Sequence, residues 1–468
     1  MPKKIFILLP DGVGLRNFAF TKFLETGKAA GHEVVFWNNT TFNLSDIGAT
    51  EVKITSSKLH KFTDLLKSAK IHIGLNLFIN RSGDQVYDTY RFPYNKDISI
   101  KFKIRNLLSR WVVRLCNSEK GFLRVEKAID WFERRTDYYQ TCRQTLLIHK
   151  PDLVFCTNQR HITAIAPLLA AQDLNIPTGT FIFSWDNLPK STMIVAADYY
   201  FVWSQYMKDE LLKYYPKISK NQIIITGTTQ FEPHFNCTLL WSKEKFFKQY
   251  QLDANKRYLC FSGDDITTSP DDEQYLDDVA TAVEKINAKG NNLGIIFRRC
   301  PVDFSDRYDA VLKKHTQTIV AIDPKWEQLG ETWNTVMPTA EDLQLQVNII
   351  ANTMFVINIA SSMVFDFAAF GKPCFYINYN ARKKRIENWN AQTIYNFVHF
   401  RSMPDKNAVY WLNSADEIQE KIENLLKDDS PEIVKTAQKW FQIINQHPPE
   451  KASERFWDAI ELITSKNS

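Results

Sequence analysis

Short apolar runs alternate with helix-length amphipathic segments along the whole chain, and few architectures accommodate this order. Runs such as PDLVFCT in the first half and MFVINIA in the second are each followed by a segment long enough for a helix. The alternation is typical of parallel sheets built from strand–helix–strand units, and the sequence therefore predicts an α/β protein. The other expected strands are KIFILLP, HEVVFW, KIHIGLNLF, PTGTFIFS, YYFVW, QIIIT, RYLCFSG, LGIIFR, TIVAID and PCFYIN.

The length of 468 residues exceeds the size that one hydrophobic core serves, so we expect two domains with a cleft between them. The strand pattern breaks near Pro233, where a polar stretch precedes a single helical segment. We expect an N-terminal domain of residues 1–234, a C-terminal domain of residues 235–445, and a last helix in residues 446–468 that packs back on the first domain. Both domains are predicted to be Rossmann-like and doubly wound, facing a central cleft. Such tandem domains are typical of enzymes that handle nucleotides or activated sugars, although a fold alone does not fix a function.

The composition excludes several classes of protein. The net charge of +5, from 58 Lys and Arg against 53 Asp and Glu, is too small and too scattered to indicate a nucleic-acid partner. The seven cysteines form no C-x-x-C pair and mostly lie in apolar runs, which favours reduced thiols and a cytoplasmic protein. No stretch approaches the roughly 18 apolar residues of a membrane span, and IFILLP is too short for the core of a signal peptide.

The segment NIASSMVFDFAAFGKP places two serines directly after an apolar run. Ser361 and Ser362 are expected at the first positions of a helix, where unpaired backbone N–H groups and the helix dipole favour an anion such as a diphosphate. Ser361 acting only as a helix cap is the alternative. Asp366 is expected on the same helix face as Ser362, near enough to reach a ribose hydroxyl or simply to lie in solvent.

A glycine turn follows the first expected strand, in LLPDGVGLRNF. Gly12 and Gly14 match the start of a dinucleotide-binding turn, but Asn17 replaces its third glycine and no acidic residue ends the second strand. A nicotinamide or flavin enzyme is therefore disfavoured. The turn is expected to let an acceptor or a phosphate approach the backbone, with Asp11 and Arg16 as polar groups at its mouth.

Polar groups also follow other strands, at the edge where ligands of open α/β sheets bind. In FSWDNLPK, Trp185, Asp186 and Asn187 combine an aromatic face, a carboxylate and an amide, a set that suits sugar recognition. A structural loop with an Asx-turn is the alternative. Gly227 and Thr228 follow the last strand of the first domain, at the expected mouth of the cleft.

Arg298 and Arg299 end a strand of the second domain. A guanidinium at this position is able to bind a diphosphate with two parallel hydrogen bonds. The alternative is that both arginines are ordinary surface residues.

Residues 100–115, within ISIKFKIRNLLSRWVVRLCN, are predicted to form a basic amphipathic helix. Such a helix is able to rest on an anionic inner membrane and meet a lipid-linked acceptor. The alternative is a helix that packs its apolar face on the first sheet. The apolar residues at helical spacing, with lysines and arginines around them, are Ile104, Leu107, Leu108, Trp111 and Leu115.

Five motifs occur in the order DGVGLRNF, FSWDNLPK, FVWSQYMKDELLKYYP, ITGTTQFEP and VINIASSMVFDFAAFGKP. Together they resemble glycosyltransferases of the GT-B type that build bacterial surface carbohydrates, within the UDP-glycosyltransferase and glycogen phosphorylase group. The resemblance spans residues 4–373. It implies a nucleotide-sugar donor, with a UDP-sugar favoured, held mainly by the C-terminal domain, and an acceptor held by the N-terminal domain.

By this resemblance Ser361, Ser362 and Asp366 contact the phosphates and ribose of the donor, and Arg298 contacts a phosphate. The family implies neither a bound metal nor another cofactor. The acidic run GDDITTSPDDE is accordingly interpreted as a solvated loop and helix start.

No residue identifies itself as the catalytic base that sugar transfer to a hydroxyl requires. Asp11, Asp186 and His161 are the candidates, each because of its place at a strand end. The predicted function is transfer of a sugar from a nucleotide-activated donor to a hydroxyl of a cell-surface glycan or lipid-linked acceptor. A nucleotide-sugar 2-epimerase, a polyol-phosphate transferase and a non-catalytic nucleotide-sugar binding protein are the alternatives.

Overall fold

The computed structural model describes residues 2–91, 99–328, 336–427 and 431–466. The chain forms two compact units, one of residues 1–230 with 444–468 and one of residues 231–443. We describe each unit by itself. In the described part of the chain, no helix is long and apolar enough to cross a membrane.

The first unit is built on a parallel sheet, with seven strands in the part of the chain that the structure describes. The chain adds strands outward from β1, returns, and starts again at β4 on the other side of β1. This is the order of a doubly wound, Rossmann-like sheet, and its direction reverses between β1 and β4. In spatial order the strands are β3 (Thr50–Lys53), β2 (Glu33–Asn38), β1 (Lys4–Leu9), β4 (Leu153–Cys156), β5 (Thr178–Phe181), β6 (Tyr199–Val202) and β7 (Ile223–Ile225).

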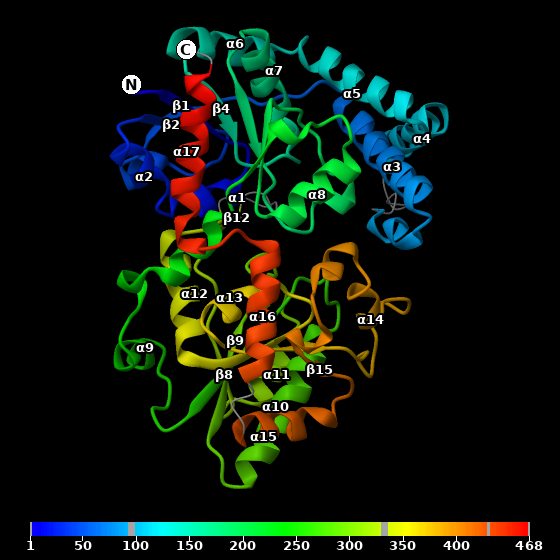
Figure 1. The fold of residues 1–468 in the computed structure, drawn as a ribbon. Coiled ribbons are helices and arrows are strands. Elements are labelled where there is room, and N and C mark those ends of the chain that lie inside the picture. The colour runs from blue at the N-terminus through cyan, green and yellow to red at the C-terminus, as the bar shows by residue number, and fades with distance from the viewer. Residues whose placement is uncertain (1, 92–98, 329–335, 428–430, 467–468) are drawn as a thin grey trace. The chain divides into compact units, whose positions relative to one another are not determined.

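Helices connect these strands, and a group of four lies between β3 and β4 (Figure 1). In this group α3 packs on α4 and α5, and α6 packs on α7, which follows β4. The helices are α1 (Gly12–Gly14), continued by the π-helical turn η1 (Leu15–Ala19), α2 (Phe23–Ala29), α3 (Thr63–Ser82), α4 (Ile100–Cys116), α5 (Glu119–Glu133), α6 (Asp137–His149), α7 (Ile165–Asp173), α8 (Gln205–Tyr214) and α17 (Ala452–Ser465).

The last helix, α17, completes the core of the first unit on the side of α2 (Figure 1). The indole N–H of Trp457 donates a hydrogen bond of 2.8 Å to the carbonyl oxygen of Phe23. Phe456 packs edge-on against Phe18 and Phe155, with ring centroids 5.4 and 5.6 Å apart. The end of the chain therefore stabilises the sheet that its beginning forms.

The second unit contains a second doubly wound parallel sheet, with six strands in the described residues. Its direction reverses between β8 and β13. A two-stranded antiparallel ribbon, β11 (Glu327–Gln328) and β12 (Val336–Met337), accompanies it. In spatial order the strands of the parallel sheet are β10 (Ile319–Ala321), β9 (Leu293–Arg298), β8 (Arg257–Ser262), β13 (Thr353–Asn358), β14 (Cys374–Ile377) and β15 (Tyr410–Leu412).

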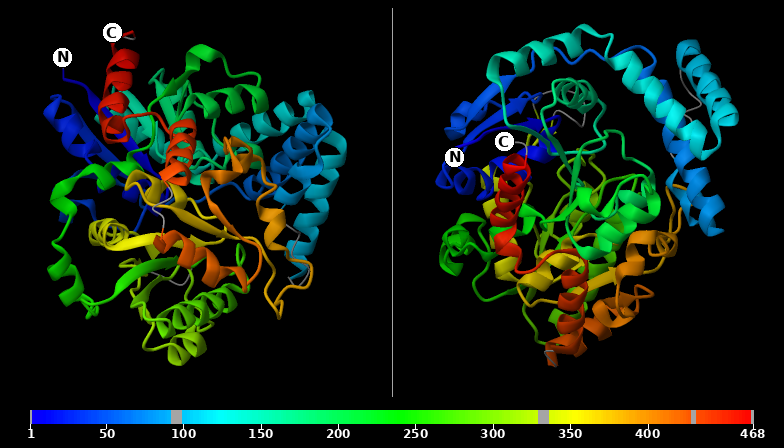
Figure 2. Two further views of the ribbon diagram at one scale, coloured as in Figure 1. Left: turned by 60° about the horizontal axis from the view of Figure 1, so that its bottom comes forward. Right: turned by 45° about the horizontal axis from the view of Figure 1, so that its top comes forward.

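The helices of the second unit fill the connections between its strands. In the ribbon drawings, α10, α11 and α15 lie near one another, and α10 contacts both of the others (Figures 1 and 2). The helices are α9 (Lys243–Gln249), α10 (Asp272–Ala288), α11 (Asp309–Lys314), α12 (Ala340–Asn352), α13 (Met363–Ala369), α14 (Ala391–Ile394), α15 (Glu417–Lys427) and α16 (Pro431–Ile444).

The predicted α/β class with two Rossmann-like, doubly wound domains is confirmed, and each expected strand but one is present. The exception is KIHIGLNLF, which lies inside the 20-residue helix α3. Ala69, Ile73 and Leu77 recur every four residues and are all buried, so the run follows a helical period. The short edge strands β3 and β15 were not predicted.

Candidate functional site

The loops that follow β1 and β4 meet where the first sheet reverses direction, a position at which open α/β sheets bind ligands. Asp11 lies two residues beyond the end of β1 and is 9% exposed. One of its carboxylate oxygens, Oδ2, accepts a hydrogen bond from the side-chain amide of Asn158, in the loop after β4. The other, Oδ1, is buried and has no hydrogen-bond partner among the described residues. A buried carboxylate oxygen without a partner is costly in a folded protein, and such groups gather at functional sites.

His161, in the same loop as Asn158, is also part of this group. Its Nδ1 shares a hydrogen bond of 2.7 Å with the hydroxyl of Thr163, which accepts one of 3.1 Å from Asn39 after β2. Burial lowers the pKa of His161; the negative charge of Asp11 opposes this shift, and Lys67 and Arg160 reinforce it. The neutral imidazole is thus favoured, which is the form that accepts a proton.

The glycine turn allows these two loops to approach each other. Gly12 is buried, and Arg16 is half-buried on η1. A Cβ atom on Gly14 would overlap the hydroxyl of Thr157 and a methyl of Leu9, so only glycine fits there. The tight turn expected from the sequence therefore serves the contact between the loops after β1 and β4.

The loop after β5 is tied together by its own side chains. Asp186 accepts hydrogen bonds from the hydroxyl of Ser184 at 2.6 Å, from the amide of Asn187 at 2.8 Å and from the ammonium of Lys190. Asn187 also accepts a bond of 3.0 Å from Gln159 and is 2% exposed, while Trp185 is 7% exposed. The polar groups of Asp186 and Asn187 thus already have protein partners, and the Trp185 ring lies largely inside the fold.

The segment after β7 lies against the end of the chain within the first unit. Gly227 has φ of +80°, in the left-handed region that favours glycine. The backbone N–H of Thr228 donates a hydrogen bond of 2.9 Å to Asn445, and Thr228 is fully buried. The guanidinium of Arg455 donates to the carbonyl oxygen of Thr226 at 2.7 Å. These contacts join the last strand to the C-terminal segment.

In the second unit, the turn after β13 lies where the sheet reverses direction. Ala360 has φ of +53°, and the N–H of Ser361 donates a hydrogen bond of 3.0 Å to the side chain of Asn358. Among the described residues, the hydroxyl of Ser361 accepts only a long bond of 3.4 Å from the N–H of Met363. Ser362 precedes α13, and its side chain makes no capping hydrogen bond within the same part of the chain. Both serines are half-buried, so neither is fixed as a strong helix cap.

Asp366 is more deeply buried than the two serines. It is 5% exposed, and its Oδ1 lies 2.6 Å from Nε2 of His234 and 3.3 Å from the side-chain nitrogen of Gln346. The alternative of a solvated side chain is therefore wrong, whereas the contact with a ribose stays a prediction. The buried pair instead joins α13 to the segment at the start of the second unit.

Arg298, at the end of β9, is likewise buried. One terminal nitrogen, Nη2, lies 2.9 and 2.8 Å from the two carboxylate oxygens of Asp342. Burial alone would raise the pKa of Asp342, but Arg298 and hydrogen bonds from Lys325 and Trp326 hold it below its usual value. The other terminal nitrogen, Nη1, is buried without a hydrogen-bond partner among the described residues. The alternative of an ordinary surface residue is wrong for Arg298, whereas Arg299 is half-buried.

The acidic run after β8 is more buried than the sequence indicated. Asp272 is fully buried at the start of α10, and burial raises its pKa to about 6 despite hydrogen bonds from Ser269 and Tyr308. Arg307 donates to the carbonyl oxygens of Asp264 and Ser269. The helix start was predicted correctly, but the expectation of a fully solvated loop was wrong. Among the described residues, no three His, Cys, Asp or Glu side chains are grouped as a metal ion would require.

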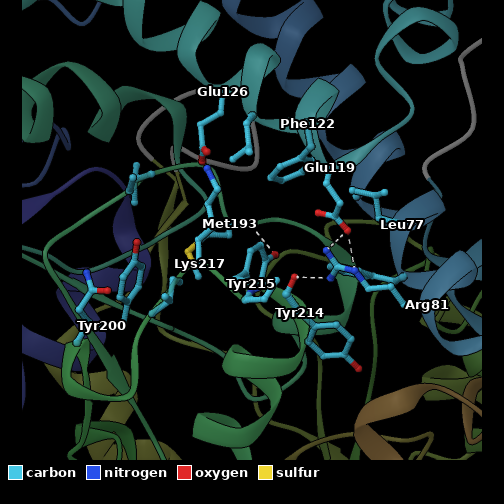
Figure 3. A pocket seen from close by; sticks show the side chains of 18 residues that line it. Leu77, Arg81, Glu119, Phe122, Glu126, Met193, Tyr200, Tyr214, Tyr215 and Lys217 are labelled. Carbon is cyan, nitrogen blue, oxygen red and sulfur yellow. Dashed lines mark hydrogen bonds and ion pairs between the residues drawn. The ribbon is translucent and has the colours of Figure 1, made fainter.

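A separate, mainly apolar cavity of about 470 Å³ lies in the first unit between α3, α5 and the end of α8 (Figure 3). Leu77, Phe122 and Met193 line it, and Arg81 bonds Glu119 and the carbonyl oxygen of Tyr214 at one end. Its lining, as far as the structure describes it, includes none of the residues that the sequence predicted for a site. The sequence did not indicate this cavity, because its walls come from distant parts of the chain.

Comparison with solved structures identifies proteins of the same fold. No family model matches the sequence, and no curated protein is significantly similar to it. A putative UDP-N-acetylglucosamine 2-epimerase from Listeria monocytogenes is 10% identical with a TM-score of 0.54, covering 98% of this chain and 96% of its own. The S. aureus MnaA structure with UDP is 12% identical with a TM-score of 0.51, covering 99% and 97%. A glycosyltransferase from Rickettsia africae is 11% identical with a TM-score of 0.51, covering all of both chains. The chain thus has the GT-B fold of two Rossmann-like domains.

Proposed function

We propose that the protein is a glycosyltransferase that moves a sugar from a nucleotide-activated donor to a hydroxyl of a cell-surface glycan or lipid-linked acceptor. The observation that supports a reaction, as opposed to binding alone, is the pair of Asp11 and His161 where the first sheet reverses direction. One oxygen of Asp11 is buried with no hydrogen-bond partner among the described residues, and burial lowers the pKa of His161, which favours its neutral form. A proton-accepting group of this kind is what an acceptor hydroxyl needs.

In this proposal the first unit binds the acceptor and supplies the base. The acceptor oxygen forms a bond to the anomeric carbon of the donor sugar, and the bond from that carbon to the diphosphate breaks. The hydroxyl proton passes to His161, and Asp11 stabilises the resulting imidazolium through its negative charge. The nucleoside diphosphate leaves with the electron pair of the broken bond.

The second unit binds the donor in this proposal, at the turn after β13. Its half-buried hydroxyls, on Ser361 and Ser362, and the backbone N–H groups beside them are donors for the diphosphate. The terminal nitrogen Nη1 of Arg298, which is buried and has no hydrogen-bond partner among the described residues, is a further donor for phosphate. Asp366, engaged by His234, is a positioning residue that fixes α13.

A nucleotide-sugar 2-epimerase is the second candidate. It is favoured by the fold similarity to the putative UDP-N-acetylglucosamine 2-epimerase from Listeria monocytogenes, which extends over nearly the whole of both chains. An epimerase inverts a carbon of the donor sugar and needs no acceptor hydroxyl. The same base, His161 with Asp11, would then act on the sugar itself.

The two candidates are distinguished by incubating the protein with UDP-sugars in the absence and presence of cell-envelope acceptor lipids. A transferase releases UDP only when an acceptor is present, whereas an epimerase produces a second UDP-sugar without one. His161→Gln is expected to abolish either activity while leaving UDP binding unchanged. Release of CMP from a CDP-polyol would identify a polyol-phosphate transferase, and binding of UDP-sugars without any turnover would contradict both enzymes.

A further inference from the structure

Helix α4 presents an apolar face to the outside of the first unit. Its inner face packs through Val112, Val113 and Cys116 against the hydrophobic core that α3 and α5 share. Figures 1 and 2 show α4 at the outer edge of this helical group. The exposed apolar residues, with their exposed fractions, are Ile100 (77%), Phe102 (41%), Ile104 (53%), Leu107 (56%), Leu108 (46%), Trp111 (52%) and Leu115 (78%).

Six of these residues, all but Phe102, form one continuous stripe, because each of the six lies three or four positions from another of them. The alternative drawn from the sequence was that this helix packs its apolar face on the first sheet. The structure instead exposes that face. A soluble surface rarely exposes so many large apolar side chains on a single helix, and such a stripe indicates a binding surface.

The charges around the stripe specify its partner. Lys103, Arg110 and Arg114 are exposed on α4, whereas the half-buried Arg105 lies 3.7 Å from a carboxylate oxygen of Asp64 on α3 and 4.7 Å from the ring of Phe102. The sequence of α4 contains no acidic residue. A second copy of the chain docked through this face would bring like charges together, whereas an anionic surface would neutralise them.

We propose that α4 is a membrane-surface helix, which lies in the headgroup region of an anionic lipid bilayer. The apolar stripe reaches the boundary with the acyl chains, and the basic side chains contact the lipid phosphates. The helix lies on the membrane and does not span it, because basic residues interrupt its apolar sequence. This inference rests on α4 and is independent of the reaction proposed above.

Flotation of the full-length protein with lipid vesicles tests the proposal. The protein is expected to bind vesicles of phosphatidylcholine with phosphatidylglycerol, to bind phosphatidylcholine alone weakly, and to be released by salt. The variant Lys103→Gln/Arg110→Gln/Arg114→Gln is expected to bind about a hundredfold more weakly, since each basic residue near an anionic surface changes the affinity by about fivefold.

The charge control is Lys22→Gln/Lys58→Gln/Lys220→Gln, which removes three exposed charges elsewhere in the first unit. The apolar variant Leu107→Gln/Trp111→Gln is expected to lose vesicle binding, and Ile148→Gln, which changes an exposed residue of α6, is expected to retain it. Circular dichroism verifies that each variant is folded.

Three results would overturn the proposal. One is the absence of binding to anionic vesicles by the wild-type protein. Another is an equal loss of binding in the α4 variant and the charge control. The third is a change from dimer to monomer in the apolar variant, seen by analytical ultracentrifugation, with vesicle binding unchanged; that result would assign the stripe to self-association.

Discussion

The reversal points of the two sheets occupy equivalent places in their units but differ in what their side chains contact. In the first unit, Asp11 keeps a buried oxygen that has no hydrogen-bond partner among the described residues, and burial lowers the pKa of His161. In the second unit, the charged candidates Arg298 and Asp366 are each paired, with Asp342 and His234 respectively, although Nη1 of Arg298 has no hydrogen-bond partner among the described residues. Side-chain chemistry is thus available at the first reversal point, whereas the second offers mainly hydroxyls and backbone donors.

This difference matches a division of labour between catalysis and binding. A base must keep a lone pair free for the proton that it accepts. A diphosphate, in contrast, is bound well by backbone N–H groups and hydroxyls that a rigid turn holds in place. The paired charges of the second unit then stabilise the scaffold on which these donors lie.

Removal of Asp342, the partner of Arg298, is expected to have the largest effect, which is a loss of stability. Asp342→Ala leaves a buried guanidinium without its counter-charge, so the free energy of unfolding should fall by about 3–5 kcal/mol, measured by urea denaturation. The control is Asp323→Ala: its side chain is 75% exposed and lies 4.0 Å from Arg299, so its loss should cost less than about 1 kcal/mol. Similar losses in the two variants would show that Arg298 is not held by a buried ion pair.

Asp11→Asn tests the role of the first unit in this comparison, namely that its reversal point takes part in catalysis. We expect kcat to fall by at least about 10²-fold, with nucleotide affinity unchanged, because the variant keeps the shape of the side chain and removes its charge. Asp186→Asn, whose carboxylate already accepts three hydrogen bonds, should lower kcat by less than about tenfold. A loss below tenfold in Asp11→Asn would remove Asp11 from the mechanism.

The smallest expected effect is a shift in the pH dependence of the rate when a charge near His161 is removed. Burial lowers the pKa of His161, so the neutral base persists below the usual pH range of histidine titration. The activity should fall only as the pH decreases through this lowered pKa, which sets the acidic limb of the profile of kcat/KM against pH. Lys67→Gln removes a nearby positive charge and should move this limb to higher pH. If the acidic limb of the Lys67→Gln profile were unchanged, His161 would not be the group whose titration sets that limb.

Much of the fold was predictable from the sequence, because buried parallel strands are continuous apolar runs. The run in α3 misled because its apolar residues satisfy the helical period as well as that of a strand, and the length of the surrounding segment decides between them. The edge strands β3 and β15, at four and three residues, are too short to leave a distinct pattern.

The sequence predicted where the candidate side chains lie in the fold. It did not predict whether their polar groups are already bonded to other parts of the protein. Strand ends place Asp11, Ser361 and Arg298 at the correct edges of their sheets. Whether each side chain is free depends on contacts far along the chain, such as His234 with Asp366, 132 positions apart. For the same reason, the sequence did not decide whether the apolar stripe of α4 is buried or exposed. Contacts with other parts of the chain determine which face of the helix is buried.

The central claim, that the turn after β13 binds the diphosphate of an activated sugar, is tested most directly by thermal stabilisation with UDP, GDP, CDP, CMP, ADP and dTDP. A nucleotide at 100 times its dissociation constant adds about 2.7 kcal/mol to the free energy of unfolding. We predict that one nucleoside diphosphate, UDP, stabilises the wild-type protein and fails to stabilise Ser361→Ala/Ser362→Ala at the same concentration. Equal stabilisation of both proteins, or none of either, would contradict the claim.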